Sequence, residues 1–207
     1  MQVIVEGVGF SYRNRQVLDQ FDARFESNRV TALVGPSGSG KSTLLAAIAG
    51  YTRPQAGHVW FADPDGQRKR PSVEQVTWIA QDANVLAART ALDNVLVGAL
   101  SDGSPFSAAS ERALTALRDV GLAHLMNERC RTMSGGEKQR VAIARSLASD
   151  RPLIVADEPS ASLDESSTRS IARLLSTIAG RATVIVATHD PVIVEAASAV
   201  VRLRGDL

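Results

Sequence analysis

The sequence predicts an α/β fold with a mainly parallel central sheet, and three short apolar runs are the main reason. Val30–Val34, Leu153–Ala156 and Thr183–Ala187 are nearly continuous apolar segments of strand length. Runs of this kind are typical of parallel strands that are covered on both faces. Helical patterns lie between the runs, and strands that alternate with helices indicate parallel strands joined by crossover helices.

Length and composition set the scale of the protein. The chain has 207 residues, which is enough for one sizeable domain with a full hydrophobic core, and we expect one domain over residues 1–207. Hydrophobic residues make up 44% and charged residues 22%, which is ordinary for a globular protein. No apolar stretch approaches the ~18–20 residues that cross a bilayer, so we expect the protein to reach a membrane only through partners.

Charge and cysteine content exclude further classes. Lys and Arg number 23 and Asp and Glu number 22, for a net charge of +1. This balance gives no electrostatic footprint for nucleic acid, and we expect no nucleic-acid partner. The short basic run Arg68–Arg70 is interpreted as a solvated loop. The single cysteine, Cys130, excludes an internal disulfide and fits a reducing cytosol.

The remaining elements follow from periodicity. Val3–Val5 and Val17–Phe25 alternate in the manner of strands and predict a small antiparallel region. Ala199–Leu203 is expected to be the last strand. Two helices are predicted from residues spaced along one face, which are Leu44, Leu45 and Ile48, and Ile171, Leu174, Leu175 and Ile178.

Residues from about Arg89 to Asn127 differ from the rest of the chain. They are rich in helical patterns, lack a clear buried strand, and are broken by the turn-forming stretch Ser101–Pro105. We interpret residues of about 89–127 as a helical subdomain, inserted in an α/β core of about 1–88 and 128–207.

The strongest local signal is Gly35-Pro36-Ser37-Gly38-Ser39-Gly40-Lys41-Ser42-Thr43, which matches the phosphate-loop pattern G-x-x-x-x-G-K-[ST]. It follows a predicted strand and opens a predicted helix, which is the context that the motif requires. Glycines let backbone N–H groups turn around phosphate oxygens, Lys41 adds a positive charge, and the Ser42 hydroxyl suits Mg²⁺. A glycine-rich loop that merely turns is the alternative, and chance rarely produces this match.

A second signal follows the run Leu153–Ala156, where the strand ends in Asp157 and Glu158. Ligand sites of parallel sheets lie beyond the carboxyl ends of the strands. We therefore expect Asp157 near a metal ion and Glu158 near an attacking water, whose proton it can accept. An ordinary strand end before Pro159 is the alternative, and Lys41 upstream argues against it.

Ser134-Gly135-Gly136-Glu137 has the pattern of a helix start. Ser134 at the N-cap and Glu137 three residues later form a capping box. Glycine at the first two helical positions disfavours a helix by roughly 1 kcal/mol each. The glycines leave backbone N–H groups uncovered beside the positive helix end, which predicts a second anion site. Because the chain has one phosphate loop, we infer that two copies share each nucleotide.

The chain resembles the nucleotide-binding subunit of an ATP-binding cassette (ABC) transporter over nearly its whole length. The order of the motifs along the chain carries this resemblance. Gly35–Ser42 is similar to the Walker A loop, Asp157 and Glu158 to the Walker B acid and the catalytic base, and Ser134–Glu137 to the signature motif. The family pattern usually reads Leu-Ser-Gly-Gly-Gln, and here Met133 and Glu137 replace its first and last residues.

The resemblance implies functional roles for four further residues. Tyr12 looks like the aromatic residue that stacks on adenine, and Gln81 like the Q-loop glutamine, which touches Mg²⁺ and senses the membrane partner. Asp164, in Ser162-Leu163-Asp164, looks like the D-loop aspartate, and His189 like the switch histidine that contacts the γ-phosphate. Alone, Tyr12 would be read as a half-buried strand aromatic, Gln81 as a polar strand end, and His189 as a surface histidine.

The resemblance implies a P-loop NTPase (RecA-like) core with ATP and Mg²⁺ as ligands. Two subunits would close head to tail around two ATP and drive transmembrane permease subunits from the cytoplasmic face of the cell membrane. The coupling would run through Gln81 and the helical residues near Leu86–Val97. The implied catalytic residues are Lys41, Glu158 and His189, and the implied Mg²⁺ ligands are Ser42, Gln81 and Asp157.

Two other classes remain as alternatives. One is an ABC ATPase that acts on DNA or ribosomes. The neutral net charge and the lack of sustained heptads between Gln81 and Ser134 argue against it. The other is a cassette that binds ATP without turnover, against which stands the joint presence of Lys41, Glu158 and His189. The stretch Thr90–Val95 and the run Ser-Gly-Gly-Glu-Lys-Gln-Arg resemble cassettes of lipoprotein-, macrolide- and haem-extruding systems.

Overall fold

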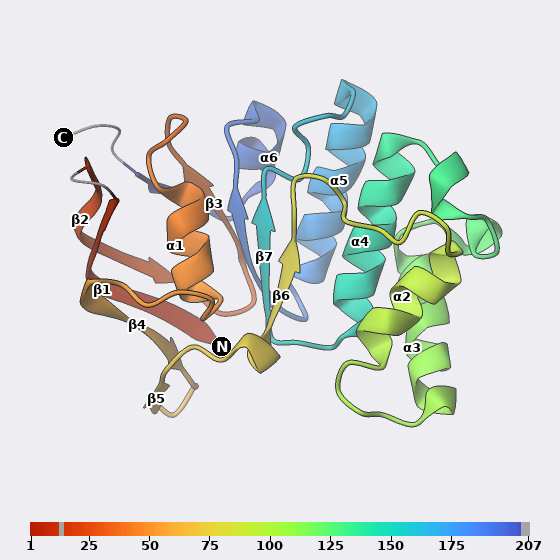
Figure 1. Cartoon of the computed structure of the whole chain (residues 1–207), viewed down its shortest axis with the longest axis horizontal. Helices are drawn as coiled ribbons and strands as arrows, with labels where there is room; N and C mark the ends of the chain where they lie inside the picture. The colour runs from red at the N-terminus through yellow and green to blue at the C-terminus, as the bar shows by residue number, and fades with distance from the viewer. Residues whose placement is uncertain (13–14, 204–207) are drawn as a thin grey trace.

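The computed structural model describes residues 1–12 and 15–203, with Tyr12 and Arg15 described by their backbone alone (Figure 1). It contains a five-stranded, wholly parallel sheet in the order β6-β7-β8-β3-β9 and a four-stranded antiparallel sheet in the order β2-β1-β4-β5. The predicted α/β class, with a parallel core and a small antiparallel region, is therefore confirmed.

The parallel sheet is formed by strands that follow the predicted apolar runs. Every residue of β3 and β8 is buried. The strands are β3 (Val30–Val34), β6 (Val76–Ile79), β7 (Leu153–Asp157), β8 (Thr183–Ala187) and β9 (Ala199–Arg202). Alternate residues contribute to two apolar clusters, because neighbouring side chains of a strand point to opposite faces. Thus Ile154 belongs to the cluster under the helices, and Val155 to the cluster under the antiparallel sheet.

The antiparallel sheet is larger than predicted. Its strands are β1 (Gln2–Tyr12), β2 (Arg15–Phe25), β4 (Ala56–Ala62) and β5 (Arg68–Lys69). Shifts of register between Val5 and Val8 interrupt the alternation of β1, which explains why the pattern stopped at Val5. The prediction of a loop at Arg68–Arg70 is wrong. Arg68 and Lys69 pair with β4, and the Arg70 guanidinium lies 4.3 Å from the centroid of the Trp60 ring.

Helices cover the two faces of the parallel sheet. α1 (Lys41–Ile48) lies on the side of the antiparallel sheet, as Figure 1 shows. The other helices are α2 (Ala91–Ala99), α3 (Phe106–Asp119), α4 (Gly135–Ala148), α5 (Glu165–Ile178) and α6 (Pro191–Ala196). Short 3₁₀ turns occur at Val73–Gln75, Ala123–Leu125 and Cys130–Thr132.

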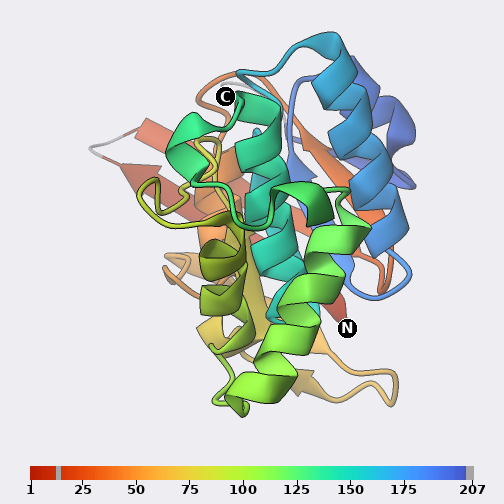
Figure 2. The ribbon, with the colours of Figure 1, turned by 90° about the vertical axis from the view of Figure 1, so that its right-hand side faces the viewer.

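The helical region is built from α2, α3 and α4, which pack on one another (Figure 2). α2 and α3 fall within the interval of about 89–127 that the sequence assigns to an insert, and the subdomain limits stay a prediction. Thr90 begins α2 with a complete capping box, in which Asp93 is the reciprocal partner. The helical region therefore begins with a strong helix-start signal at Thr90.

Candidate functional site

Strand order brings the predicted site residues to one edge of the parallel sheet. β6, β7, β8 and β3 are consecutive neighbours in the sheet and run in the same direction. Gln81 follows β6, Asp157 and Glu158 stand at the end of β7, and His189 follows β8. The glycine loop follows β3. Because the carboxyl ends of parallel strands share one edge, residues distant in sequence converge there.

The glycine loop adopts a conformation that glycine makes possible. Gly38 and Gly40 have φ angles of 78° and 92°, in the left-handed region. A Cβ on Gly40 would lie 2.7 Å from the Val17 side chain, so the loop also lacks room for one. The Ser39 hydroxyl is buried and has no hydrogen-bond partner among the residues that the structure describes. The loop thus forms a tight backbone cradle, and the Ser39 hydroxyl in it remains available for a hydrogen bond.

Lys41 is held at the start of α1. The residue is 9% exposed, and its Nζ donates hydrogen bonds to the carbonyls of Gly35 at 2.8 Å and Pro36 at 3.2 Å. Nζ also lies 3.7 Å from Oε1 of Glu158. A buried ammonium needs partners of this kind because desolvation of a charge is costly. The cation is therefore fixed between the cradle and the acid that follows β7.

Glu158 occupies a strained position with well-defined partners. Its φ is 47°, which is uncommon for a residue with a side chain, and its backbone N–H donates to the carbonyl of Ala187 at 2.8 Å. A carboxylate oxygen lies 3.0 Å from Nδ1 of His189. An ionised carboxylate accepts such a hydrogen bond from a protonated Nδ1. Glu158 thus connects Lys41 with His189.

Sequence reasoning missed Ser160 and Asp190, which form a hydrogen bond close to Glu158 and His189. The buried Ser160 donates from Oγ to a carboxylate oxygen of Asp190 at 2.9 Å. Asp190 also caps α6, because its other carboxylate oxygen accepts from the N–H of Val192 at 3.0 Å. Asp190 before Pro191 is a helix-start signal, and it could have been found in the sequence. Its link to Ser160 depends on the tertiary fold.

The residues around the cradle form a cavity of about 390 Å³. Ser42, Gln81 and Asp157 line it together with the glycine loop, Lys41 and Glu158. Hydroxyl, amide and carboxylate oxygens are donors that Mg²⁺ accepts, and Mg²⁺ commonly binds one or two carboxylates together with substrate phosphates. Within residues 1–12 and 15–203, no group of three His, Cys, Asp or Glu residues could hold a metal alone. The residues present fit an ion that is held jointly with a phosphate chain.

The predicted capping box at the start of α4 is present. Ser134 Oγ accepts from the N–H of Glu137 at 3.3 Å, and Glu137 accepts from the N–H of Ser134 at 2.8 Å. The hydrogen bond from the Ser134 backbone holds the pKa of Glu137 below its usual range. This segment does not line the cavity over the cradle. The structure of one chain therefore brings Lys41, Glu158 and His189 together, but not Ser134–Glu137.

The two glycines of this segment differ in their surroundings. Gly135 is exposed, whereas Gly136 is buried against α5, where an added Cβ would lie 2.8 Å from Ser167 Oγ. Asp164 caps α5 by accepting from the N–H of Ser167 at 2.8 Å, a bond that lowers the pKa of Asp164. Close packing is thus a reason for Gly136 that sequence reasoning missed.

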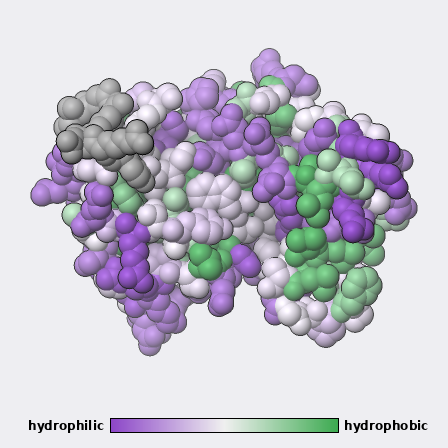
Figure 3. Space-filling view, in the orientation of Figure 1, coloured by the Kyte–Doolittle hydropathy of each residue, from purple (hydrophilic) through white to green (hydrophobic). Residues whose placement is uncertain are grey.

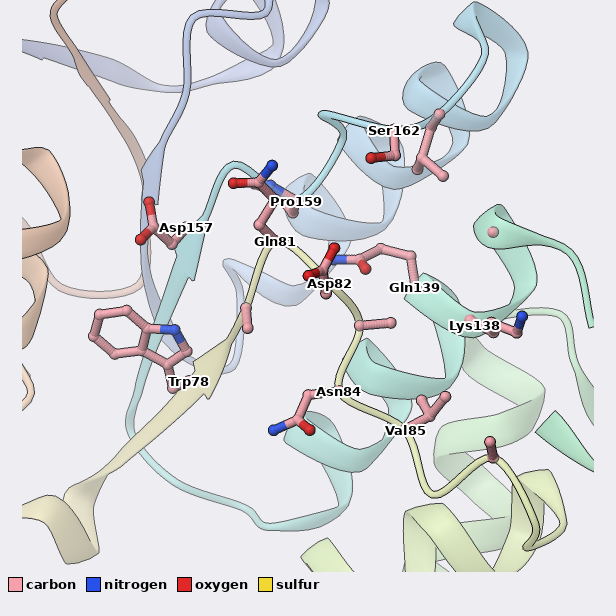
Figure 4. Close-up of a pocket in the computed structure, with 15 residues that line it drawn as sticks. Trp78, Gln81, Asp82, Asn84, Val85, Lys138, Gln139, Asp157, Pro159 and Ser162 are labelled. Atoms are coloured by element: carbon pink, nitrogen blue, oxygen red, sulfur yellow. The ribbon is translucent and has the colours of Figure 1, made fainter. Parts of the chain in front are cut away.

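A larger cavity, of about 780 Å³, lies between the loop after β6, the start of α4 and the loop after β7. Figure 4 shows Gln81 and Asp157 on its sheet side, and Gln139 of α4 pointing toward Asp82. Gln139 is 2% exposed, and its amide nitrogen has no hydrogen-bond partner in the described part of the chain. Gln81 lines both cavities. The prediction for Tyr12 lies outside the described side chains.

The chain is similar to proteins of one family. The family model described as "ABC transporter" matches residues 18–161. The lipoprotein-releasing system ATP-binding protein LolD of Saccharophagus degradans is 34% identical, over 98% of this chain and 92% of that protein. The phosphonates import ATP-binding protein PhnC 2 of Rhodopseudomonas palustris is 36% identical, over 90% of this chain and 70% of that protein.

Solved structures agree with this relationship. The dimeric structure of MJ0796, described as a bacterial ABC transporter cassette, superposes with a TM-score of 0.82 at 27% identity, over 98% of this chain and 94% of that one. A post-hydrolysis state of the same cassette, bound to ADP and Pi, superposes with a TM-score of 0.81 at 27% identity, over 97% and 94%. Among the helices of the described residues, none is long and apolar enough to cross a membrane. With its glycine cradle and its family match, the chain belongs to the ABC transporter family as an ATP-binding, ATP-hydrolysing cassette.

Proposed function

We propose that the chain is a Mg²⁺-dependent ATPase subunit that dimerises head to tail around two ATP and drives transmembrane permease subunits. The observation that carries the proposal is the contact of Glu158 with both Lys41 and His189 beside the glycine cradle. These three side chains supply a cation, a proton acceptor and a polar clamp in one place. A site with all three is suited to phosphoryl transfer to water.

Each residue has a distinct chemical task in this proposal. The N–H groups of Gly35–Thr43 and the Lys41 ammonium bind the phosphate chain and offset its charge. Glu158 orients the attacking water and accepts its proton, and His189 holds the γ-phosphate. Bound Mg²⁺, held by Ser42, Gln81 and Asp157, would neutralise charge on the phosphate oxygens. Tyr12 is proposed to stack on the adenine.

A second copy is proposed because Ser134, Gly135 and Gly136 do not line the cavity over their own cradle. The exposed N-terminus of α4 has backbone N–H groups and a positive dipole end, which favour an anion. In a head-to-tail pair, this segment and the D-loop residue Asp164 would contact the ATP that the other copy holds. The dimeric form of the related cassette MJ0796 supports this arrangement.

A permease contact is proposed at the helical region. Val97 is 54% exposed, Leu100 is 40% exposed and Phe106 is 67% exposed. Figure 3 shows a green, apolar area on the side of the molecule where Figure 1 draws α2 and α3. Leu86, in the loop after Gln81, is 49% exposed. Exposed apolar patches of this kind often bind other proteins. We propose that cytoplasmic segments of the permease bind here, which would hold the chain at the cytoplasmic face of the cell membrane.

The transported class is proposed to be that of the lipoprotein-, macrolide- or haem-extruding systems. Support comes from the stretch Thr90–Val95 and from the similarity to LolD along 98% of the chain. The similar identity to PhnC 2, named for phosphonate import, fits a cassette whose cargo is selected by the permease. Purification of the tagged chain from detergent-solubilised membranes, with identification of the bound membrane protein, tests this class. Recovery of an import permease would contradict it.

The ATPase is tested with the purified chain, alone and with its permease in vesicles. We expect Mg²⁺-dependent phosphate release that the permease stimulates. Gln81→Ala should reduce the stimulation by the permease by a larger factor than it weakens binding of ATP with Mg²⁺. Unchanged stimulation in this variant would contradict the coupling role of Gln81.

A further inference from the structure

The loop that follows Gln81 is fastened to the helical region along most of its length. Asn94 of α2, which is fully buried, accepts from the N–H of Leu86 at 2.6 Å and donates to the carbonyl of Leu86 at 3.1 Å. The carbonyl of Ala87 accepts from the N–H of Arg131 at 2.8 Å. These bonds make the later part of the loop continuous with α2 and its neighbours.

Arg145 of α4 holds the middle of the same loop. Its Nη1 donates to the carbonyl of Asn84 at 2.9 Å, and its Nη2 donates to the carbonyl of Ala83 at 3.4 Å. No carboxylate lies within ion-pair distance of Arg145 in the described part of the protein. Burial lowers the pKa of its guanidinium. Arg145 is partly buried, and within the described residues its guanidinium binds backbone carbonyls alone, so these bonds have to offset its desolvation.

The earlier part of the loop is held differently. Of the hydrogen bonds among the described residues, none involves Gln81 or Asp82. Figure 4 shows these two residues at the end of β6, with Asn84 further along the loop. Within the described residues, the loop therefore has no hydrogen-bonded support at Gln81 and Asp82, and Arg145 binds it immediately afterwards, at Ala83 and Asn84.

We propose that Arg145 is a positioning residue that joins the loop of Gln81 to the helix that begins at Ser134. The inference rests on the proposed function, in which Gln81 serves the ATP of its own chain and Ser134–Gly136 serves the ATP of the other copy. Through Arg145, a displacement of residues 83–89 moves α4 as well, so that the two ATP sites of a dimer respond together. The cradle itself lies on β3 and α1 and does not depend on this connection.

The test compares Arg145→Ala and Arg145→Lys with a matched control, Arg112→Ala. Arg112 of α3 also donates to a backbone carbonyl, that of Ala99, within the helical region, and among the described residues none of its hydrogen bonds reaches the loop of Gln81. Each variant is measured for thermal stability, for equilibrium binding of a nonhydrolysable ATP analogue, and for kcat and KM of ATP hydrolysis by the purified chain without permease.

We expect Arg145→Ala to lower kcat about fivefold to tenfold, the range that coupling residues typically produce. Binding of the analogue should change by less than about twofold, because the cradle is intact. Arg145→Lys should recover part of kcat, because a lysine can bind one of the two carbonyls. Arg112→Ala should keep kcat near the parent value even where its melting temperature falls.

Several results would overturn the inference. One is a kcat for Arg145→Ala equal to that of Arg112→Ala, and another is a parallel loss of analogue binding and kcat. If Arg145→Ala fails to fold, Arg145→Lys decides the question. A kcat below that of Arg112→Ala, together with faster amide exchange in the loop after Gln81, supports the positioning role. A parent-like kcat, or a lowered kcat with unchanged exchange in that loop, contradicts it. Failure of the proposed function is separate, because it would appear as absent hydrolysis in the parent or full activity in Glu158→Gln.

Discussion

A carboxylate oxygen of Glu158 lies 3.0 Å from Nδ1 of His189, across the neighbouring strands β7 and β8. The Glu158 side chain is 15% exposed and the His189 side chain is 73% exposed. A largely buried carboxylate thus faces an exposed imidazole ring. Water bound beside this pair would contact a proton acceptor and a hydrogen-bonding ring at the same time.

Glu158→Gln is expected to abolish most of the hydrolysis while ATP still binds. General-base groups typically contribute about 10²–10⁴-fold to the rate, and glutamine cannot accept the proton. The measurement is phosphate release at saturating ATP, with binding followed by calorimetry. Glu165→Gln is the matched control, because Glu165 is exposed on α5 and pairs with Arg169. Equal loss of activity in both variants would remove the special role of Glu158.

Lys41→Ala is expected to weaken ATP binding by about tenfold to a hundredfold, which corresponds to the loss of one strong charge-assisted hydrogen bond. The effect should appear in the equilibrium dissociation constant, because Lys41 contacts the cradle itself. Lys69→Ala is the control, since Lys69 pairs with Asp63 in the antiparallel sheet. Unchanged affinity in Lys41→Ala would contradict the assignment of the cradle.

Gly136→Ala is expected to destabilise the fold, and Gly135→Ala is not. An added Cβ at 136 would lie 2.8 Å from Ser167 Oγ, whereas at 135 it would lie 3.4 Å from the Leu163 side chain, an ordinary contact. Overpacking of this kind costs about 1–3 kcal/mol, partly offset by the better helix propensity of alanine.

Urea unfolding of the single variants and of Gly136→Ala with Ser167→Ala isolates this contact. The double variant should recover part of the lost free energy of unfolding, because the Oγ atom is gone. Strict additivity of the two substitutions would show that the close approach is not the cause.

Glu137→Gln is expected to lower the melting temperature at neutral pH, by an amount that shrinks in acid. Hydrogen bonds from Ser134 hold the pKa of Glu137 below its ordinary range in the folded state. The stabilisation is therefore fully present above the ordinary glutamate pKa of about 4.3, and it is lost as the pH falls through the folded-state pKa. Melting curves of parent and variant from pH 7 to pH 3 test this. A difference that grows in acid would contradict the capping interaction.

The sequence was sufficient for the parallel sheet because Val30–Val34 and Thr183–Ala187 are buried on both faces, which leaves an unmistakable apolar run. It was insufficient for the antiparallel sheet. Register shifts in β1 broke its alternation, and β5 is two exposed residues whose pairing with β4 depends on tertiary context. The local sequence pattern alone does not predict such strands.

At the site, Lys41 and Glu158 could be predicted from the sequence, because each stands in a motif whose chemistry calls for that residue type. Contacts that depend on three-dimensional proximity could not be predicted, and the pairs Ser160–Asp190 and Gly136–Ser167 are examples. Arg145 was missed for the same reason, because its partners are backbone carbonyls that carry no sequence signal.

The most direct test of the account is the mass of Glu158→Gln in solution, measured by light scattering with and without saturating ATP and Mg²⁺. We predict a monomer without nucleotide and a dimer with it, and a return to monomer when Ser134→Arg is added to the variant. A protein that binds ATP at the cradle and stays monomeric would contradict the claim that two copies complete each site.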